Sequence, residues 1–270
     1  MEEKKEELII DNIDDLKNDV KMRGFNNHFD QEIETRIKAE ETEFILKKAP
    51  MQVNNDQMDY GLHCRVDEAN RKGYANDLEA TLTNSATGEV RQYKFPGFLR
   101  VTAKEAYNLL KYGQDTAVYK KLFNKEGQQY ESYLTMDKDG ELKQLHQNYY
   151  KNKMFRLEEA LDNLAVPVKE VETDKSRVVS SLKRGNVHAS TIYHNGQEQP
   201  GFLTVNAITG DIDVRDKDMK VIKRQDQDLK KEKEITQTQT PGQGEDLKKK
   251  SGNEQKVKWS PRKTAGIKIK

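Results

Sequence analysis

The stretch that decides the fold class is YGLHCRV, residues 60–66, in which an apolar side chain occupies every second position. The stretch DLEATL, residues 77–82, repeats this alternation after a turn-rich segment, and VRQYKF, residues 90–95, follows a Thr-Gly pair. Alternation with a period of two is typical of a strand that buries one face. This region therefore predicts three strands joined by short connections.

The sequence before these strands has helical periodicity instead. Residues 5–22 place their apolar side chains on one stripe, with acids and lysines on the opposite side. Asp30 can cap a second helix, which Ala49-Pro50 would end. Residues 1–50 therefore predict an N-terminal helical hairpin.

Short helices and hairpins are predicted to alternate in the rest of the body. Thr102 and Glu105 match the capping box, in which each side chain accepts a hydrogen bond from the backbone of the other residue. The expected helices cover residues 103–112, 117–123, 155–164 and 175–184, and the expected strands cover residues 130–136, 141–145, 187–193, 197–205 and 211–214. The fold class predicted is α+β, with antiparallel β-hairpins and meanders and intervening short helices.

A weak internal repeat links three of the expected hairpins. Its copies are Leu82-Thr83 to Gly88-Glu89, Leu134-Thr135 to Gly140-Glu141, and Leu203-Thr204 to Gly210-Asp211. In each copy, a glycine that can adopt positive φ precedes a strand that restarts with an acid. Convergent turn chemistry explains the repeat about as well as duplication does.

Composition indicates where the folded body ends. With 34% hydrophobic and 34% charged residues and a mean hydropathy of −1.01, the chain is too polar to fold from end to end. After residue 225 the apolar periodicity stops, which predicts a disordered C-terminal tail. The expected domains are a helical hairpin at 1–50, an α+β body at 51–225 that can divide into sub-lobes at 51–165 and 166–225, and the tail at 226–270.

The net charge of +1 conceals a polarised chain. Residues 1–50 contain fourteen acids and nine bases, whereas residues 226–270 contain twelve bases and seven acids. Six bases lie in the last fifteen residues, which contain no acid. Such a segment favours contacts to phosphates, and its one aromatic residue can stack on a base. The predicted nucleic-acid-binding residues are Lys256, Lys258, Trp259, Arg262, Lys263, Lys268 and Lys270. A solvated basic tail is the competing interpretation.

The single cysteine, Cys64, cannot form an intramolecular disulfide and fits a reducing compartment. No stretch of about 20 apolar residues predicts a membrane span, and the acidic N-terminus does not resemble a secretory leader. We therefore expect a cytoplasmic protein without a membrane partner.

Motifs that would indicate catalysis, a cofactor or a metal do not emerge from the sequence. His63 and Cys64 are adjacent on a predicted strand and would point to opposite faces. The acid runs at 137–141 and 211–218 do not have the ligand spacing of a calcium loop and are interpreted as turn residues and as the solvent face of strands. We expect no catalytic residue, metal or cofactor. The remaining candidate is a small polar cluster of His146, Tyr149 and Tyr150.

Several separated motifs occur in a recognisable order, including TAKEAYNLL at 102–110, AVYK at 117–120 and SLKRGN at 181–186. Over roughly residues 12–225, they resemble a domain-of-unknown-function family that is widespread in the chromosomes and conjugative elements of Bacteroides-type gut bacteria. The resemblance implies a bacterial cytoplasm and an association with mobile elements. It implies no activity and no site residue.

Three functions follow as hypotheses. The first is a non-enzymatic accessory protein of a bacterial mobile element, with a body that binds an unknown protein and a tail that contacts nucleic acid. The second is a regulatory or inhibitor module that binds protein and has no nucleic-acid role. The third is an enzyme with a novel site near His146. The charge distribution favours the first.

Overall fold

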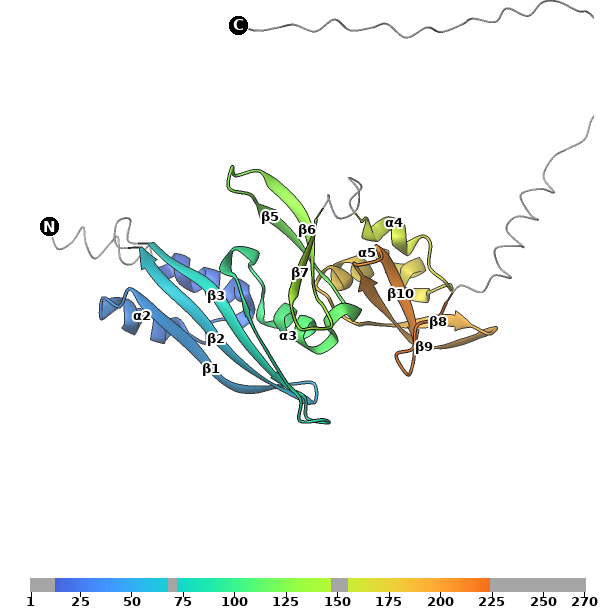
Figure 1. Cartoon of the computed structure of the whole chain (residues 1–270), viewed down its shortest axis with the longest axis horizontal. Helices are drawn as coiled ribbons and strands as arrows, with labels where there is room; N and C mark the ends of the chain where they lie inside the picture. Colours follow the sequence, from blue (N-terminus) through green and yellow to red (C-terminus); the bar gives the residue numbers. More distant parts are fainter. Residues whose placement is uncertain (1–12, 68–71, 147–154, 224–270) are drawn as a thin grey trace, which may run out of the picture. The chain divides into compact units, whose positions relative to one another are not determined.

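The structure is a computed structural model that describes residues 13–67, 72–146 and 155–223. The chain divides into two units, residues 1–225 and 226–270, and the second unit lies outside the described residues. The predicted α+β class is confirmed: the described part contains helices and three antiparallel sheets (Figure 1).

The first sheet contains the strands that the sequence indicated most clearly. Its order is β1-β2-β3-β4, and each neighbouring pair is antiparallel. The strands are β1 (Glu43–Val53), β2 (Asp56–Asp67), β3 (Lys72–Thr83) and β4 (Val90–Phe95). The alternating apolar side chains of residues 60–66 are buried on one face, as predicted.

The other two sheets are three-stranded meanders. One contains β5 (Val118–Phe123), β6 (Gln129–Met136) and β7 (Leu142–His146). The other contains β8 (His188–His194), β9 (Gln197–Asn206) and β10 (Asp211–Asp216). The predicted hairpin and the predicted last meander are therefore confirmed.

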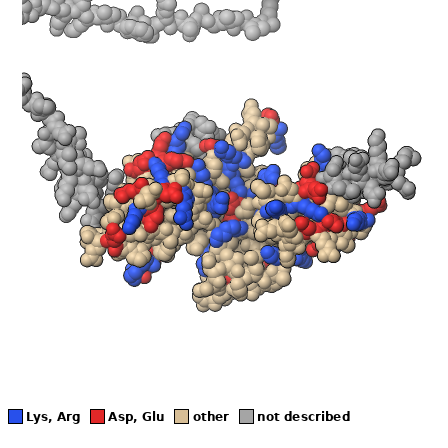
Figure 2. Space-filling model, turned by 180° about the vertical axis from the view of Figure 1, so that it is seen from behind, with Lys and Arg blue, Asp and Glu red and all other residues tan. Residues whose placement is uncertain are grey.

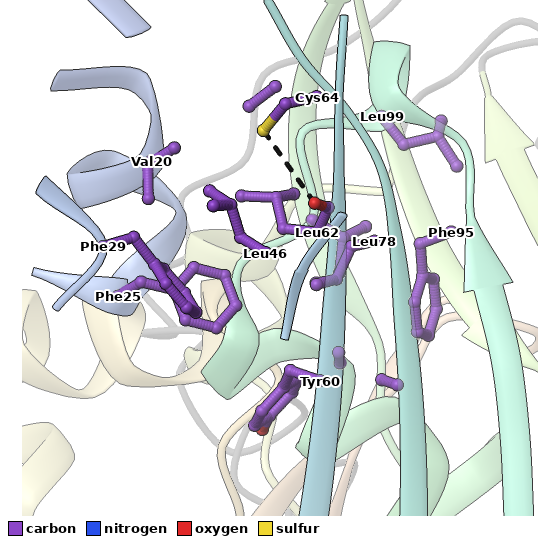
Figure 3. Close-up of a cluster of buried hydrophobic side chains, with 14 of the residues drawn as sticks. Val20, Phe25, Phe29, Leu46, Tyr60, Leu62, Cys64, Leu78, Phe95 and Leu99 are labelled. Atoms are coloured by element: carbon purple, nitrogen blue, oxygen red, sulfur yellow. Dashed lines mark hydrogen bonds between the residues drawn. The ribbon is translucent and has the colours of Figure 1, made fainter. Parts of the chain in front are cut away.

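Helical residues 13–20, the wide turn η1 (Lys21–Phe25) and α2 (Asp30–Lys38) pack against the first sheet. The Phe25 ring contacts both Phe29 and Tyr60, with ring centroids 5.6 and 5.7 Å apart. Figure 3 shows these rings between the helical segment and the sheet. The helical residues thus share one core with the sheet.

The predicted extension of the second helix to residue 49 is wrong. Helix α2 ends at Lys38, Glu40 adopts a positive φ of 58°, and strand β1 begins at Glu43. Phe44 and Leu46 are buried in alternation and pair with β2. Cross-strand pairing has overridden a local pattern that a helix could also satisfy.

The helix predicted at residues 117–123 is also wrong, because this segment is β5 and pairs with β6. Val118 and Leu122 are both buried and lie four residues apart, which suits either a helix or a strand. Lys120 lies between them and directs its Nζ to Glu105 at 2.5 Å. The true period of the segment is therefore two.

The capping box of α3 (Ala103–Tyr112) is confirmed. The Glu105 amide donates to Thr102 Oγ1 at 3.3 Å, and the Thr102 amide donates to Glu105 Oε2 at 2.8 Å. Helix α4 (Leu157–Leu161) is shorter than expected. Helix α5 (Lys169–Lys183) begins before the predicted start, but Asp174 interrupts it with non-helical φ/ψ and accepts from the Arg177 amide, as a cap does.

The described residues bury two hydrophobic clusters. The first includes side chains from Ile13 to Met136, and the second includes side chains from Ala117 to Val214. Polar contacts link the two regions: Asn108 donates to the Arg184 carbonyl at 3.0 Å, and Thr116 donates to the Gly185 carbonyl at 2.8 Å. The helical residues before position 50 have no separate core among these clusters.

Candidate functional site

A groove lies beside β4, between the C-terminal end of α3 and the turn from β6 to β7. Its cavity has a volume of about 570 Å³. Helix α3 and strand β6 reach this place from positions far apart in the sequence. The lining residues are Glu89, Arg91, Gln92 and Tyr93; Leu109, Leu110, Tyr112, Gly113 and Gln114; and residues 136–141.

One edge of β4 is unpaired among the described residues. The Asn84 amide donates to the Glu89 carbonyl at 2.8 Å, which sets the alternation of the ladder between β3 and β4. Because hydrogen-bonded and non-hydrogen-bonded pairs alternate, the backbone groups of Val90, Gln92 and Lys94 point away from β3. In the described part of the chain, no strand or loop pairs with them.

The opposite edge of the same sheet is built differently. Strand β1 has a register shift between Lys48 and Met51, and Pro50 lies within the shifted segment. A bulge and a proline are features that block the addition of another strand to a sheet edge. Strand β4 contains neither a proline nor a register shift. The edge beside the groove is therefore the more open to pairing.

The lining of the groove favours positive charge. Its acids are Glu89, Asp137, Asp139 and Glu141, and its bases are Arg91 and Lys138; Lys143, whose Nζ lies 2.9 Å from Asp137, adds a third base beside the lining and leaves a net charge of −1. Arg91 is already engaged, since Nε lies 2.8 Å from Glu89 and Nη1 donates to the Leu110 carbonyl at 3.0 Å. The C-terminal end of α3, which carries a negative partial charge, also faces this region.

The turn from β6 to β7 holds its acids in a fixed conformation. Asp137 Oδ1 accepts hydrogen bonds from the Asp139 and Glu141 amides, both at 2.9 Å. Together with Lys143 Nζ, also 2.9 Å away, these donors lower the pKa of Asp137. The acid run at 137–141 thus forms a turn, as the sequence predicted, and it presents carboxylates to the groove.

Polar contacts hold the loop after α3 against the neighbouring strands. Thr135 Oγ1 donates to the Gly113 and Thr116 carbonyls at 3.3 and 2.8 Å. The buried Arg215 side chain donates to Asp115 Oδ1 at 2.9 Å. These contacts hold the loop after α3, which lines the groove at Gly113 and Gln114, against β6 and β10.

The apolar residues at the groove contribute little exposed surface. Leu109, Leu110 and Met136 are at most 4% exposed. Burial of apolar area is therefore a minor source of affinity here, because it scales with the area removed from water. Recognition must rely on backbone hydrogen bonds and on charge.

The residues predicted from the sequence do not lie in this groove. His146 is exposed at the end of β7, while Tyr149 and Tyr150 lie outside the described residues. The seven predicted tail residues, from Lys256 to Lys270, also lie outside them. The structure therefore does not test either predicted site.

Cys64 and His63 point to opposite faces of β2, as expected. Cys64 is 3% exposed, and burial raises the pKa of its thiol to about 12. Cys64 thus packs as a small core residue, and Figure 3 shows it among apolar side chains. His63 lies on the other face, with Nε2 2.8 Å from Glu79 Oε1. Within the described residues, no group of three or more His, Cys, Asp or Glu side chains is placed to hold a metal.

Comparison of the chain with protein-family models, with curated proteins and with solved structures gives no match. The resemblance to the Bacteroides-type family therefore stays a prediction. Among the described residues, no helix has both the length and the apolar character needed to cross a membrane.

Proposed function

We propose that this chain is a non-enzymatic interaction protein, whose groove binds an extended, basic segment of a partner protein as an added strand on β4. The observation that carries the proposal is the edge of β4 at Val90, Gln92 and Lys94, which no described strand pairs, together with the cavity that Gln92 and four carboxylates line. Strand addition of this kind takes affinity from main-chain hydrogen bonds and specificity from side chains. It combines the protein-binding role predicted for the body with a defined surface.

The groove suits a short and weakly bound segment. Three outward-facing residues offer up to six backbone hydrogen bonds, each worth roughly 1 kcal/mol net. Association and ordering of the peptide cost several kcal/mol in return, so the net free energy of binding is a few kcal/mol and we expect a Kd of about 1 mM or weaker. Complementary charge would then select basic segments over acidic ones.

The chemistry of the lining supports binding more than catalysis. The residues that line the groove include four carboxylates but no histidine, cysteine or serine. A hydrolytic or transfer site commonly pairs a nucleophile with a general base. An enzyme centred on His146 remains an alternative hypothesis, which depends on residues outside the described part.

A defined peptide tests the proposal. The probe is Thr-Lys-Val-Lys-Thr-Val with blocked ends, and its control has glutamate in place of both lysines. Gln92→Pro removes one outward amide and leaves the pairing with β3 intact, whereas Gln92→Ala keeps that amide. We expect the full-length protein and Gln92→Ala to bind the lysine peptide and Gln92→Pro to bind it at least about tenfold more weakly, which corresponds to roughly 1.4 kcal/mol. Equal binding by the two variants, or equal binding of both peptides, would refute the proposal.

Nucleic-acid association through the tail is a second candidate, which the acid-free sequence of residues 256–270 favours. On the face of the described part shown in Figure 2, basic and acidic side chains are interspersed, and no continuous basic surface forms there. The test compares the full chain with a variant in which the six bases of this segment become glutamine. We expect the slope of log K against log salt to flatten by about 0.9 for each phosphate contact that is lost. Identical DNA binding by both proteins would exclude the tail as the contact.

A further inference from the structure

The cavity beside β4 borders one face of the strand and not the other. Arg91 and Tyr93 line it, whereas Val90 and Lys94 do not. Arg91 Nη1 donates to the Leu110 carbonyl of α3, and Tyr93 packs against the first hydrophobic cluster, so both side chains point to the face of the sheet that α3 covers. Successive side chains of a strand alternate between faces, so Val90 and Lys94 point to the opposite side. We call these sides the α3 face and the open face.

A strand added to β4 divides its side chains between the same two faces, because directly paired residues of neighbouring strands point to the same side. Two of its positions, opposite Arg91 and Tyr93, lie on the α3 face. Three positions, opposite Val90, Gln92 and Lys94, lie on the open face. Only the first two point into the cavity.

We propose that the groove selects the added strand by one face only. Its ligand is a protein segment in which lysine or arginine recurs at every second position and points toward α3, while the side chains between are uncharged. This inference rests on the proposed function of the groove and names the class of segment that it binds.

Unpaired charge on the α3 face favours a cation. Two acids of the lining are neutralised locally, since Glu89 lies 2.8 Å from Arg91 and Asp137 lies 2.9 Å from Lys143. The charged side chains that remain are exposed on the turn from β6 to β7: Lys138, Asp139 and Glu141. They leave a net charge of −1 beside the two positions that point into the cavity. The half-buried Tyr93 ring adds an aromatic face that attracts a cation.

The open face has the same net charge but a different arrangement. Lys94 Nζ lies 3.5 Å from Asp77 and 3.8 Å from Glu79, and Glu79 lies 2.8 Å from His63, so the group carries −1 with His63 neutral. Both acids belong to β3, two strand spacings or about 10 Å from an added strand, which exceeds the Debye length of about 8 Å in physiological salt. Lys94 lies on β4 itself, only one spacing away. A lysine on the open face therefore meets a like charge first.

Two peptides of identical composition and blocked ends test this inference. The lysines of Thr-Lys-Val-Lys-Thr-Val lie on one face of a strand, whereas those of Thr-Lys-Val-Thr-Lys-Val lie on opposite faces. No direction or register of pairing can point both lysines of the second peptide toward α3. In NMR titrations of the full-length protein, we expect the first peptide to bind about threefold to fivefold more tightly, which is the scale of one solvent-exposed charge contact.

Charge variants identify the residues responsible. Asp139→Asn/Glu141→Gln should weaken binding of the one-face peptide and abolish the preference, because Lys138 then remains as a like charge on the α3 face. The control Glu126→Gln/Glu131→Gln makes the same charge change at exposed positions on the hairpin from β5 to β6, and it should retain the preference.

The outcomes separate this inference from the proposed function. Equal affinity of the wild type for the two peptides would overturn selection by one face, while strand addition on β4 would stand. A preference that survives in Asp139→Asn/Glu141→Gln, or that is lost equally in the control, would also overturn it. If neither peptide binds, the proposed function fails and this inference fails with it.

Discussion

Replacement of Lys111 by methionine should remove the partner of a buried carboxylate. Asp56 begins β2 with a side chain that is 5% exposed, and Lys111 Nζ lies 2.8 Å from its Oδ2. The Tyr107 hydroxyl donates to the same oxygen at 3.2 Å, and the Ser85 amide donates to Oδ1 at 3.4 Å. The substitution keeps most of the volume and leaves the carboxylate without a cation.

The expected loss follows from these contacts. Breaking a buried ion pair by removing one partner costs about 3–5 kcal/mol. The Lys111 side chain is 26% exposed and the two other donors remain, so we expect a smaller decrease in the free energy of unfolding, of about 2–3 kcal/mol. Lys121→Met, at an exposed position on β5, removes a lysine without touching a buried carboxylate and should stay close to the wild type.

The destabilisation caused by the Lys111 substitution should depend on pH, because the charge of Asp56 does. Burial alone would raise the pKa of Asp56, but hydrogen bonds and charge from Lys111, with help from Tyr107 and Ser85, lower it. A lowered pKa in the folded state adds stability above the unfolded value of about 3.9, and this stability is lost as the pH falls through the folded value. Without Lys111, burial should dominate and raise the pKa. The destabilisation should therefore be largest near neutral pH and shrink on acidification.

Urea unfolding of both variants at neutral pH and at about pH 3.5 measures these quantities, because the free energy of unfolding falls linearly with denaturant. A decrease in the free energy of unfolding below about 0.5 kcal/mol at neutral pH would show that Lys111 does not stabilise the Asp56 carboxylate. So would a loss that grows in acid, since protonation should relieve an unpaired carboxylate.

Three further experiments test the packing. Gly185 has φ of +71°, and an added Cβ would lie 2.9 Å from a side-chain carbon of β5, whereas Gly127 has φ of +76° and open space. In urea unfolding, the free energy of unfolding should therefore fall by about 2–4 kcal/mol for Gly185→Ala and by about 1 kcal/mol for Gly127→Ala. Equal decreases would contradict the close approach of Gly185 to β5. Cys64 should react with a thiol reagent only as fast as the protein unfolds, and rapid reaction in the native state would show that it is not buried. Arg215→Met removes the ion pair with Asp115 and should therefore speed amide exchange in the loop after α3. Unchanged exchange would show that this ion pair does not hold the loop.

Much of the β-structure could be predicted because its signals are local. The three repeat copies coincide with the hairpins β3–β4, β6–β7 and β9–β10. Gly88, Gly140 and Gly210 each have a φ between 70° and 81°, and their conformation depends on the residue itself. The alternation in residues 60–66 was likewise sufficient to predict β2, and the capping box was sufficient to predict the start of α3.

The errors arose where spacing fits two structures. Phe44 lies seven residues after Ile37, a spacing that continues the helical stripe, and Val118 lies four residues before Leu122, a spacing that suits either a helix or a strand. Pairing with β2 and with β6, which is not encoded locally, decides these cases.

The groove could not be predicted because it combines three distant segments. Residues near 90, 110 and 138 meet only after the sheet, the helix and the second hairpin have packed. One signal was present: β4 contains no proline or bulge, whereas the residues of the other edge strand include Pro50. That contrast becomes informative only when the strand order shows which strands are at the edges.

Amide hydrogen exchange of the full-length chain shows whether a peptide adds as a strand on β4. We expect the amides of Val90, Gln92 and Lys94 to exchange rapidly in the free protein and to become protected when the lysine peptide is added in excess. The amides of Arg91 and Tyr93 pair with β3 and should be protected throughout. Peptide binding that leaves Val90, Gln92 and Lys94 unprotected would exclude strand addition at this edge.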